Sequence, residues 1–237
     1  MFAFPSKSLP QLFAALCAGL SLSLSLPMQA VAGENPQPTI RAMFGAKPLE
    51  RLEPASTALL VIDFQNEYFT GRMPIPDGPG ALEKTRELIA FADRAKIPVY
   101  HIQHVAPAGS PVFARGSEGW KFHPDMRPRQ QDKVLEKTTV SVFASTDLDA
   151  RLKRDGIRTL IISGLMTHAC VAGAARDAAP LGYQVVVASD ATATRAITRY
   201  NGEGVDKDSL HRAALAEIED TFGDVLTTAQ IMRLSLH

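Results

Sequence analysis

The chain has 237 residues, of which 46% are hydrophobic and 21% are charged, as is ordinary for a globular protein. Lysine and arginine together number 25, as do aspartate and glutamate, so the formal net charge is +0 at pH 7. This balance lacks the electrostatic signature of a nucleic-acid-binding protein and gives no attraction to an anionic membrane surface. We therefore expect neither nucleic acid nor a membrane as a partner of the folded protein.

Residues 1–32 are predicted to be a secretory signal peptide. Lys7 and the terminal amine precede an almost uncharged apolar stretch from Leu9 to Leu26, and Ala30-Val31-Ala32 resembles a cleavage site. The stretch is about 18 residues long, near the lower limit for a membrane span, so an uncleaved anchor is the alternative. We expect an exported protein, periplasmic or secreted, that leaves the membrane when the leader is cleaved.

Leader cleavage would remove Cys17 and leave Cys170 as the only cysteine. An internal disulfide would then be impossible, even in an oxidising compartment. A lone thiol is either a small buried hydrophobe or a reactive group, and its place in the fold distinguishes the two.

Residues 33–56 are rich in proline and polar side chains and are predicted to form an irregular N-terminal arm before a single domain at 57–237. In that domain we predict strands at 57–63, 98–104, 133–137, 158–163, 184–189 and 224–226, and helices at 81–96, 147–155, 170–181 and 209–222. The alternation predicts an α/β fold, a three-layer sandwich with a six-stranded, mainly parallel sheet in the Rossmann-like order 3-2-1-4-5-6.

Two predicted connections, 105–132 and 192–208, are longer than simple loops. The first contains Phe113, Trp120 and Phe122 among glycine and proline, which argues against disorder. Long ordered loops in compact domains are usually functional. We expect the first loop to cover a substrate, with a subunit contact as the alternative.

Cys170 follows a buried strand at the point where a helix is predicted to begin. The apolar run from Leu160 ends at Ser163-Gly164, and the carboxyl ends of parallel strands are where ligands bind in such sheets. The N-terminus of a helix also favours negative charge, including a thiolate. We therefore interpret Cys170 as a cysteine nucleophile.

Asp63 and Lys137 end two other predicted strands at the same edge. In the predicted order the strands of Asp63 and Cys170 are neighbours, about 5 Å apart. The strand of Lys137 lies two spacings from that of Asp63, about 10 Å, so its long side chain would have to bridge the gap. From position alone, a solvated surface lysine is the alternative.

The charges of these three residues suggest a division of roles. Asp63 can take the thiol proton and return it to a leaving amine, while the Lys137 ammonium favours the thiolate. The backbone N–H groups of Met166 and Cys170 are candidates for an oxyanion hole.

Side chains near the strand ends supply candidate substrate contacts, with core packing as the alternative. The aromatic candidates are Phe64, Tyr68, Phe69 and Trp120. We select Phe64, Gln65, Phe69 and Trp120 as substrate-binding residues.

Three histidines near these positions are weaker candidates. His168 lies two residues from Cys170 and points to a different side, so we expect a structural role and no Cys–His pair. His101 and His104 are three apart on a strand, so they face opposite sides and make a poor chelate. His104, at the strand end, contacts either substrate or the core.

The segments 60–66, 136–143, 164–171 and 182–194 together resemble the isochorismatase-like cysteine hydrolases, which include nicotinamidases and N-carbamoylsarcosine amidases. The resemblance implies that Asp63, Lys137 and Cys170 form a catalytic triad. It also implies a cis peptide between Leu165 and Met166 and assembly into homo-oligomers.

Two departures from the family pattern narrow the function. Nicotinamidases of this family carry an Asp-x-His metal motif after the second strand, whereas this chain reads His104-Val105-Ala106-Pro107. We therefore expect no metal and no cofactor, and nicotinamide is disfavoured. True isochorismatases lack the cysteine, so Cys170 indicates hydrolysis of a carbon–nitrogen bond in a small amide, carbamoyl or ureido substrate through a thioester. The alternatives are vinyl ether hydrolysis driven by Asp63, and a redox-sensing or ligand-binding thiol without catalysis.

Overall fold

The structure is a computed structural model that describes residues 37–237, so the predicted signal peptide lies outside the described residues. Residues Pro38–His237 form one compact unit. No helix within 37–237 is long and apolar enough to span a membrane.

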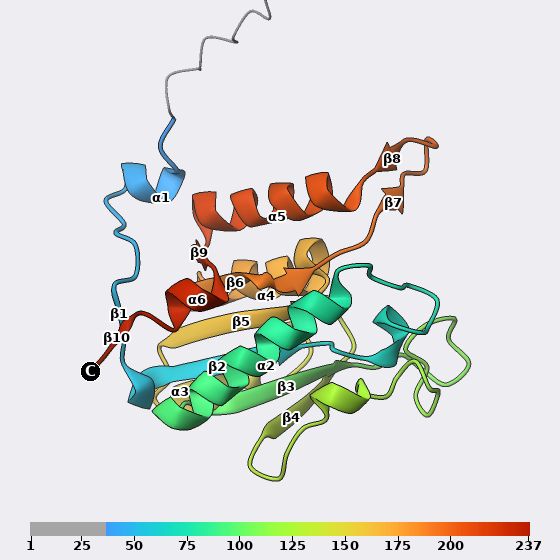
Figure 1. Ribbon diagram of the computed structural model, residues 1–237, viewed down its shortest axis with the longest axis horizontal. Coiled ribbons are helices and arrows are strands. Elements are labelled where there is room, and N and C mark those ends of the chain that lie inside the picture. The colour runs from blue at the N-terminus through green and yellow to red at the C-terminus, as the bar shows by residue number, and fades with distance from the viewer. Residues whose placement is uncertain (1–36) are drawn as a thin grey trace, which may run out of the picture. The chain divides into compact units, whose positions relative to one another are not determined.

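A six-stranded parallel sheet is the centre of this unit (Figure 1). Its strands are β2 (Thr57–Ile62), β3 (Val99–His104), β4 (Lys133–Lys137), β5 (Thr159–Leu165), β6 (Gln184–Ala193) and β9 (Asp224–Leu226). They are ordered β4-β3-β2-β5-β6-β9, and every neighbouring pair is parallel. Numbered along the chain, this is the predicted order 3-2-1-4-5-6.

Helices cover both faces of the sheet. On one face lie α2 (Gly78–Ala95) and α6 (Thr228–Ile231), and on the other lie α3 (Leu148–Arg154), α4 (Ala172–Ala178) and α5 (Lys207–Thr221). The predicted three-layer α/β sandwich is confirmed.

The central strands are buried on both faces, which explains their continuous apolar sequences. Along β2, Leu59 and Val61 pack under α2, whereas Leu60 and Ile62 pack toward α3 and α4. All four side chains are at most 1% exposed. Truncating one of them to alanine would cost about 2–5 kcal/mol.

The predicted irregular arm has short regular elements from residue 38 onward, which corrects the prediction for that part. These elements are α1 (Ile40–Met43), β1 (Arg51–Leu52) and the 3₁₀ turn η1 (Pro54–Ser56). β1 pairs in parallel with β10 (Ser235–Leu236), so the last residues of the chain hold the arm.

Two predicted boundaries near the strand ends need correction. The helix expected at 170–181 begins with η4 (Thr167–Val171), a π-helical turn, and α4 ends at Ala178. β6 continues to Ala193, past the predicted end at 189, because a register shift between Ile162 and Gly164 lets β5 pair with it again.

The connection after β2 and the two long connections contain local structure. η2 (Asn66–Tyr68) follows β2, and the first long loop contains the 3₁₀ turn η3 (Pro124–Met126). The second contains an antiparallel hairpin of β7 (Ile197–Thr198) and β8 (Gly204–Val205).

Candidate active site

The ends of β2 and β5 are held close together by their backbones. Gly164 pairs with Ile62, and a Cβ atom on Gly164 would lie only 2.4 Å from the Ile62 carbonyl oxygen. Only glycine permits this approach. Beyond Ile62, Asp63 adopts a positive φ of 55°, a conformation that costs energy for a residue with a Cβ atom and that concentrates at functional sites.

The structure brings together the side chains of Asp63, Lys137 and Cys170. Lys137 Nζ lies 2.8 Å from Asp63 Oδ2 and 3.3 Å from Cys170 Sγ. Asp63 and Lys137 are 0% exposed and Cys170 is 5% exposed. The lysine side chain therefore spans the two strand spacings, and the surface-charge alternative for Lys137 is excluded.

The Asp63 carboxylate keeps accepting capacity within this cluster. Although Lys137 forms an ion pair with Oδ2, neither oxygen has a partner in hydrogen-bond geometry within residues 37–237. A buried carboxylate in this condition can accept a proton from an adjacent group.

The Cys170 thiol is protonated at neutral pH, because burial outweighs the Lys137 ammonium, which favours the thiolate. Burial, reinforced by the Asp63 charge, raises the pKa of Cys170 to about 12, and Lys137 opposes this only in part. Because only the thiolate attacks, the proton must be removed during the reaction.

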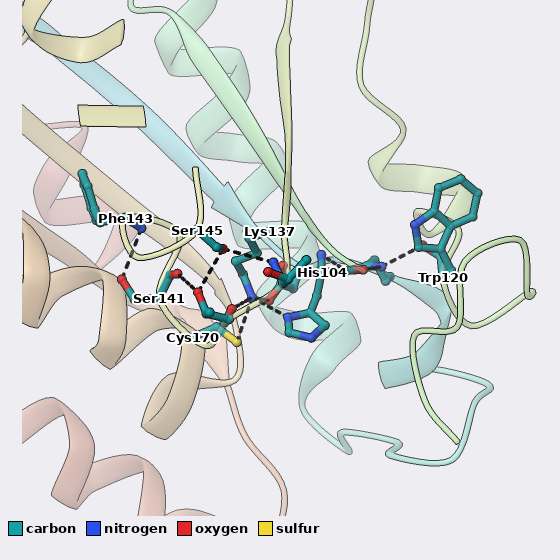
Figure 2. A network of polar contacts seen from close by, with 11 residues as sticks. His104, Trp120, Lys137, Ser141, Phe143, Ser145 and Cys170 are labelled. Atoms are coloured by element: carbon teal, nitrogen blue, oxygen red, sulfur yellow. Dashed lines mark hydrogen bonds and ion pairs between the residues drawn. The ribbon is translucent and has the colours of Figure 1, made fainter. Parts of the chain in front are cut away.

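The Lys137 side chain is a buried ammonium with several acceptors. Burial favours the neutral amine, but the charges of Asp63 and Cys170 outweigh it and raise the pKa of Lys137. Its Nζ also lies 2.9 Å from His104 Nδ1 and 3.2 Å from the Thr139 carbonyl oxygen (Figure 2).

Asp63, His104 and Cys170 have the spacing of metal ligands, since their donor atoms all lie within 4.8 Å of one another. The Lys137 ammonium contacts all three residues and so occupies the position of a cation among them. Two positive charges there would repel strongly, so this residue set does not fit a metal ion.

Cys170 lies in the π-helical turn η4, a type of turn that is frequent at functional sites. The Val171 N–H donates to the Met166 carbonyl oxygen at 3.2 Å, five residues back. The Leu165–Met166 peptide is cis, as the resemblance implied. The oxyanion-hole candidates Met166 and Cys170 therefore lie at the two ends of one short segment.

Side chains on both sides anchor this turn. Thr167 Oγ1 lies 2.9 Å from His211 Nδ1 on α5, and His168 Nδ1 lies 2.5 Å from Thr194 Oγ1 after β6. His168 therefore bonds away from the thiol, in the structural position that we expected.

Phe64 and Gln65 are buried and have contacts within the protein, and their contact with a substrate stays a prediction. Phe64 is 0% exposed and belongs to the core under α2. The Gln65 side-chain amide donates to the carbonyl oxygens of His104 and Trp120, at 2.9 and 2.7 Å, and accepts from the His104 N–H at 2.8 Å. Gln65 thus fastens the first long loop to β3.

Phe69 and Trp120 also lie away from the thiol. Phe69 packs against the His123 ring, with centroids 4.3 Å apart. Trp120 lines a hollow of about 470 Å³ whose lining contains no residue of the Asp63–Lys137–Cys170 cluster. Figure 2 shows its indole pointing away from Cys170. The structure does not bring either side chain to the thiol.

Tyr68, an aromatic residue that we did not select, lies beside the sulfur. It is 2% exposed, and burial together with the charges of Cys170 and Asp63 raises its pKa well above the usual value. Its position in η2, five residues after Asp63, was the available signal, but sequence spacing does not show which aromatic side chain turns inward.

Arg195 is a second residue that sequence analysis missed. Its Nε is buried without a hydrogen-bond partner, and no carboxylate within residues 37–237 forms an ion pair with it. Burial and then the Arg195 charge lower the pKa of His168, and the same charge acts on Tyr68. Arg195 directly follows Thr194, whose Oγ1 contacts His168, and its Nη1 donates to the Ala196 carbonyl oxygen at 3.1 Å.

Comparison with known proteins identifies the class. The chain belongs to the isochorismatase family, because the family model of the Isochorismatase domain matches residues 57–230. This range includes Asp63, Lys137 and Cys170.

Individual relatives are similar over most of their lengths. The chain is 32% identical to the secreted isochorismatase effector Isc1 of Verticillium dahliae, over 81% of this chain and 98% of the relative. It is 28% identical to the ureidoacrylate amidohydrolase RutB of Acinetobacter baylyi, over 79% of this chain and 86% of the relative.

Solved structures show the same fold. An isochorismatase from Pseudomonas putida has a TM-score of 0.75 at 27% identity, covering 81% of this chain and 98% of that one. A cysteine hydrolase from Pseudomonas syringae pv. phaseolicola has a TM-score of 0.73 at 26% identity, and the match covers 79% of this chain and 97% of that one. The protein is a cysteine hydrolase of the isochorismatase family, and its relatives include amidohydrolases.

Proposed function

We propose that the protein hydrolyses a carbon–nitrogen bond in a small amide, carbamoyl or ureido substrate through a thioester on Cys170. The observation that carries this proposal is the buried Cys170 thiol beside the Lys137 ammonium and the Asp63 carboxylate. The amidohydrolase relative supports the bond type.

In the first half-reaction, Asp63 takes the thiol proton as Sγ attacks the carbonyl carbon. The raised pKa of Cys170 makes this proton transfer part of the attack. The N–H groups of Met166 and Cys170 would stabilise the oxyanion. As the carbon–nitrogen bond breaks, Asp63 returns the proton to the leaving nitrogen, which departs as an amine or ammonia.

In the second half-reaction, water attacks the thioester carbon and Asp63 accepts a proton from it. The carbon–sulfur bond then breaks, the acid product is released, and Asp63 returns the proton to sulfur. Lys137 stabilises negative charge on sulfur and on Asp63 throughout, because it lies between the two.

We propose that the substrate carries a negatively charged group. Arg195 supplies a cation near the thiol-bearing turn with no acid to neutralise it within the described residues. A substrate carboxylate could pair with its guanidinium in bidentate geometry.

The test is a panel of small amides and ureido compounds, each offered with and without a carboxylate. We expect turnover, and an acyl adduct on Cys170 by intact mass after rapid quenching. We also expect Arg195→Gln to raise KM about tenfold for carboxylate-bearing substrates only. Full turnover by Cys170→Ala would exclude the thioester route.

The two alternatives predict different outcomes. Vinyl ether hydrolysis driven by Asp63 would survive Cys170→Ala. A redox-sensing thiol would be oxidised rapidly by peroxide and would hydrolyse no amide, but the raised pKa of Cys170 disfavours the thiolate that such oxidation needs.

We further propose that the protein is exported and acts as a homo-oligomer. A relative is named as a secreted effector, which supports export, and the family resemblance supports assembly. Expression of the full chain should yield a mature N-terminus at Gly33 outside the cytoplasm. Sedimentation should give a mass above that of one chain, and a monomer that retained the leader would contradict both proposals.

A further inference from the structure

The Lys137 ammonium has more acceptors around it than it has protons. It carries three N–H bonds and meets Asp63 Oδ2 at 2.8 Å, His104 Nδ1 at 2.9 Å, the Thr139 carbonyl oxygen at 3.2 Å and Cys170 Sγ at 3.3 Å. The direction of each N–H bond therefore depends on which acceptors are strongest and nearest. His104 is the nearest neutral acceptor.

This contact fixes the state of the His104 ring. An ammonium has no lone pair, so it can only donate, and His104 Nδ1 must be unprotonated to accept. The neutral ring then carries its proton on Nε2. Burial, with the nearby Lys137 charge, lowers the pKa of His104, which keeps the ring neutral at pH 7.

Contacts hold both the backbone and the ring of His104. Gln65 accepts from the His104 N–H at 2.8 Å and donates to its carbonyl oxygen at 2.9 Å. The Phe113 ring packs against the imidazole, with centroids 5.0 Å apart. Gln65 itself is 0% exposed and lies two residues after Asp63, so one rigid segment supports both partners of the ammonium.

We propose that His104 is a positioning residue for the hydrolysis proposed above: its Nδ1 takes one N–H of Lys137, which leaves another for Cys170 and holds the ammonium charge against Asp63. Figure 2 shows the ammonium between the His104 ring and the Cys170 sulfur. When one N–H bond of the flexible Lys137 side chain is fixed in direction, its positive charge stays near both Asp63 and Cys170.

The same geometry excludes His104 as the base for either half-reaction. Its single lone pair is on Nδ1 and is occupied by the ammonium, so a proton from sulfur or water must go elsewhere. The Asp63 carboxylate, which has no partner in hydrogen-bond geometry within residues 37–237, is the available acceptor.

The activity test compares three variants of the full chain on a substrate that the panel identifies. We expect His104→Leu to lower kcat about 100-fold with KM changed less than threefold, since it affects chemistry more than binding. His104→Asn places an amide oxygen near the position of Nδ1 and should recover at least tenfold of that loss. His237→Asn, on the exposed chain end, is the control and should match wild type.

Two outcomes of this test would overturn the proposal. One is a kcat of the His104→Leu variant equal to that of wild type. The other is an equal loss in the Leu and Asn variants with lowered melting temperatures, because a purely structural role would not distinguish an acceptor from a hydrocarbon.

A second measurement does not depend on substrate. Nitrogen-15 NMR of the wild-type imidazoles should show His104 with its proton on Nε2, and Lys137→Met should shift its titration to higher pH. A ring protonated on Nδ1 would overturn the inference. If the NMR result is as expected but no amide is hydrolysed, the proposed function fails while the Lys137–His104 contact remains.

Discussion

The protein contains two clusters in which a buried carboxylate, a cation and a β3 histidine meet, and they differ in how the carboxylate is hydrogen-bonded. At the carboxyl end of β3, His104 contacts Lys137, which pairs with Asp63. On the opposite face, His101 Nε2 lies 3.3 Å from Asp132 Oδ2, and Asp132 pairs with Arg129. Both clusters are thus built on the same strand, three residues apart.

In the Arg129 cluster, hydrogen bonds satisfy the carboxylate. Asp132 accepts from the Arg129 backbone N–H at 2.8 Å and from two guanidinium nitrogens at 3.0 and 2.8 Å. Burial would raise the pKa of Asp132, but these bonds outweigh it and lower the pKa. The same guanidinium also binds Asp93. A carboxylate held in this way stays ionised and has little tendency to accept a proton.

Within residues 37–237, Asp63 forms an ion pair with Lys137 but accepts no hydrogen bonds like those of Asp132. Its partner Lys137 is a point charge on a flexible stem, whereas Arg129 is a planar fork that matches a carboxylate. An ion pair of a buried carboxylate can serve stability or chemistry, depending on whether the carboxylate retains accepting capacity.

Removing the cation from each cluster should give the largest difference. Lys137→Met leaves Asp63 buried without a counter-charge, so we expect a loss of about 3–5 kcal/mol in the free energy of unfolding and of about 10³-fold or more in turnover. Arg129 is 35% exposed, so Arg129→Met should cost about 1–3 kcal/mol and leave turnover within about threefold. Urea denaturation and initial rates measure both. Equal losses of turnover would contradict the division of roles.

Acid should destabilise the protein through His101. Burial lowers the pKa of His101 to about 4, from an ordinary value of 6.5. In the unfolded chain His101 therefore binds a proton more tightly than in the folded protein. Its contribution to the free energy of unfolding is fully present above pH 6.5 and is lost as the pH falls to about 4. The shift corresponds to about 3 kcal/mol.

His101→Gln is the matched test, because glutamine does not titrate. Denaturation at pH 7 and pH 4 should show a smaller pH difference in this variant than in wild type. An unchanged pH difference would place the acid sensitivity elsewhere.

The effect of Asp63 on the reactivity of Cys170 should be the smallest of the three. Because burial and Asp63 raise its pKa to about 12, iodoacetamide should react slowly at pH 7 and about tenfold faster for each unit of rising pH through pH 10. Asp63→Asn removes one cause of the shift and should speed alkylation at pH 8, as followed by intact mass. A rate that levels off between about pH 9 and pH 10 would show an ordinary thiol, whose pKa is about 8.5.

Much of the fold follows from sequence because its causes are local. Continuous apolar runs indicate strands buried on both faces, and β2 is such a run. The meeting of Asp63 with Cys170 follows from strand order. The closeness of Lys137 did not follow, because it depends on a side-chain conformation across two strand spacings.

The substrate-side residues could not be assigned for a different reason. After β2 the chain enters η2, where neither the strand nor the α-helix period applies, so Phe64 and Gln65 turn into the core while Tyr68 turns to the sulfur. The π-helical form of η4 is likewise set by tertiary contacts, such as that between Thr167 and His211.

The position of Lys137 has a consequence for how the enzyme depends on its surroundings. A positive charge that is covalently tethered to the chain cannot be leached by a chelator or lost in a medium poor in trace elements. Under the proposed mechanism, EDTA should leave turnover intact. Under that mechanism, the metal-ion content of the surroundings would not affect turnover.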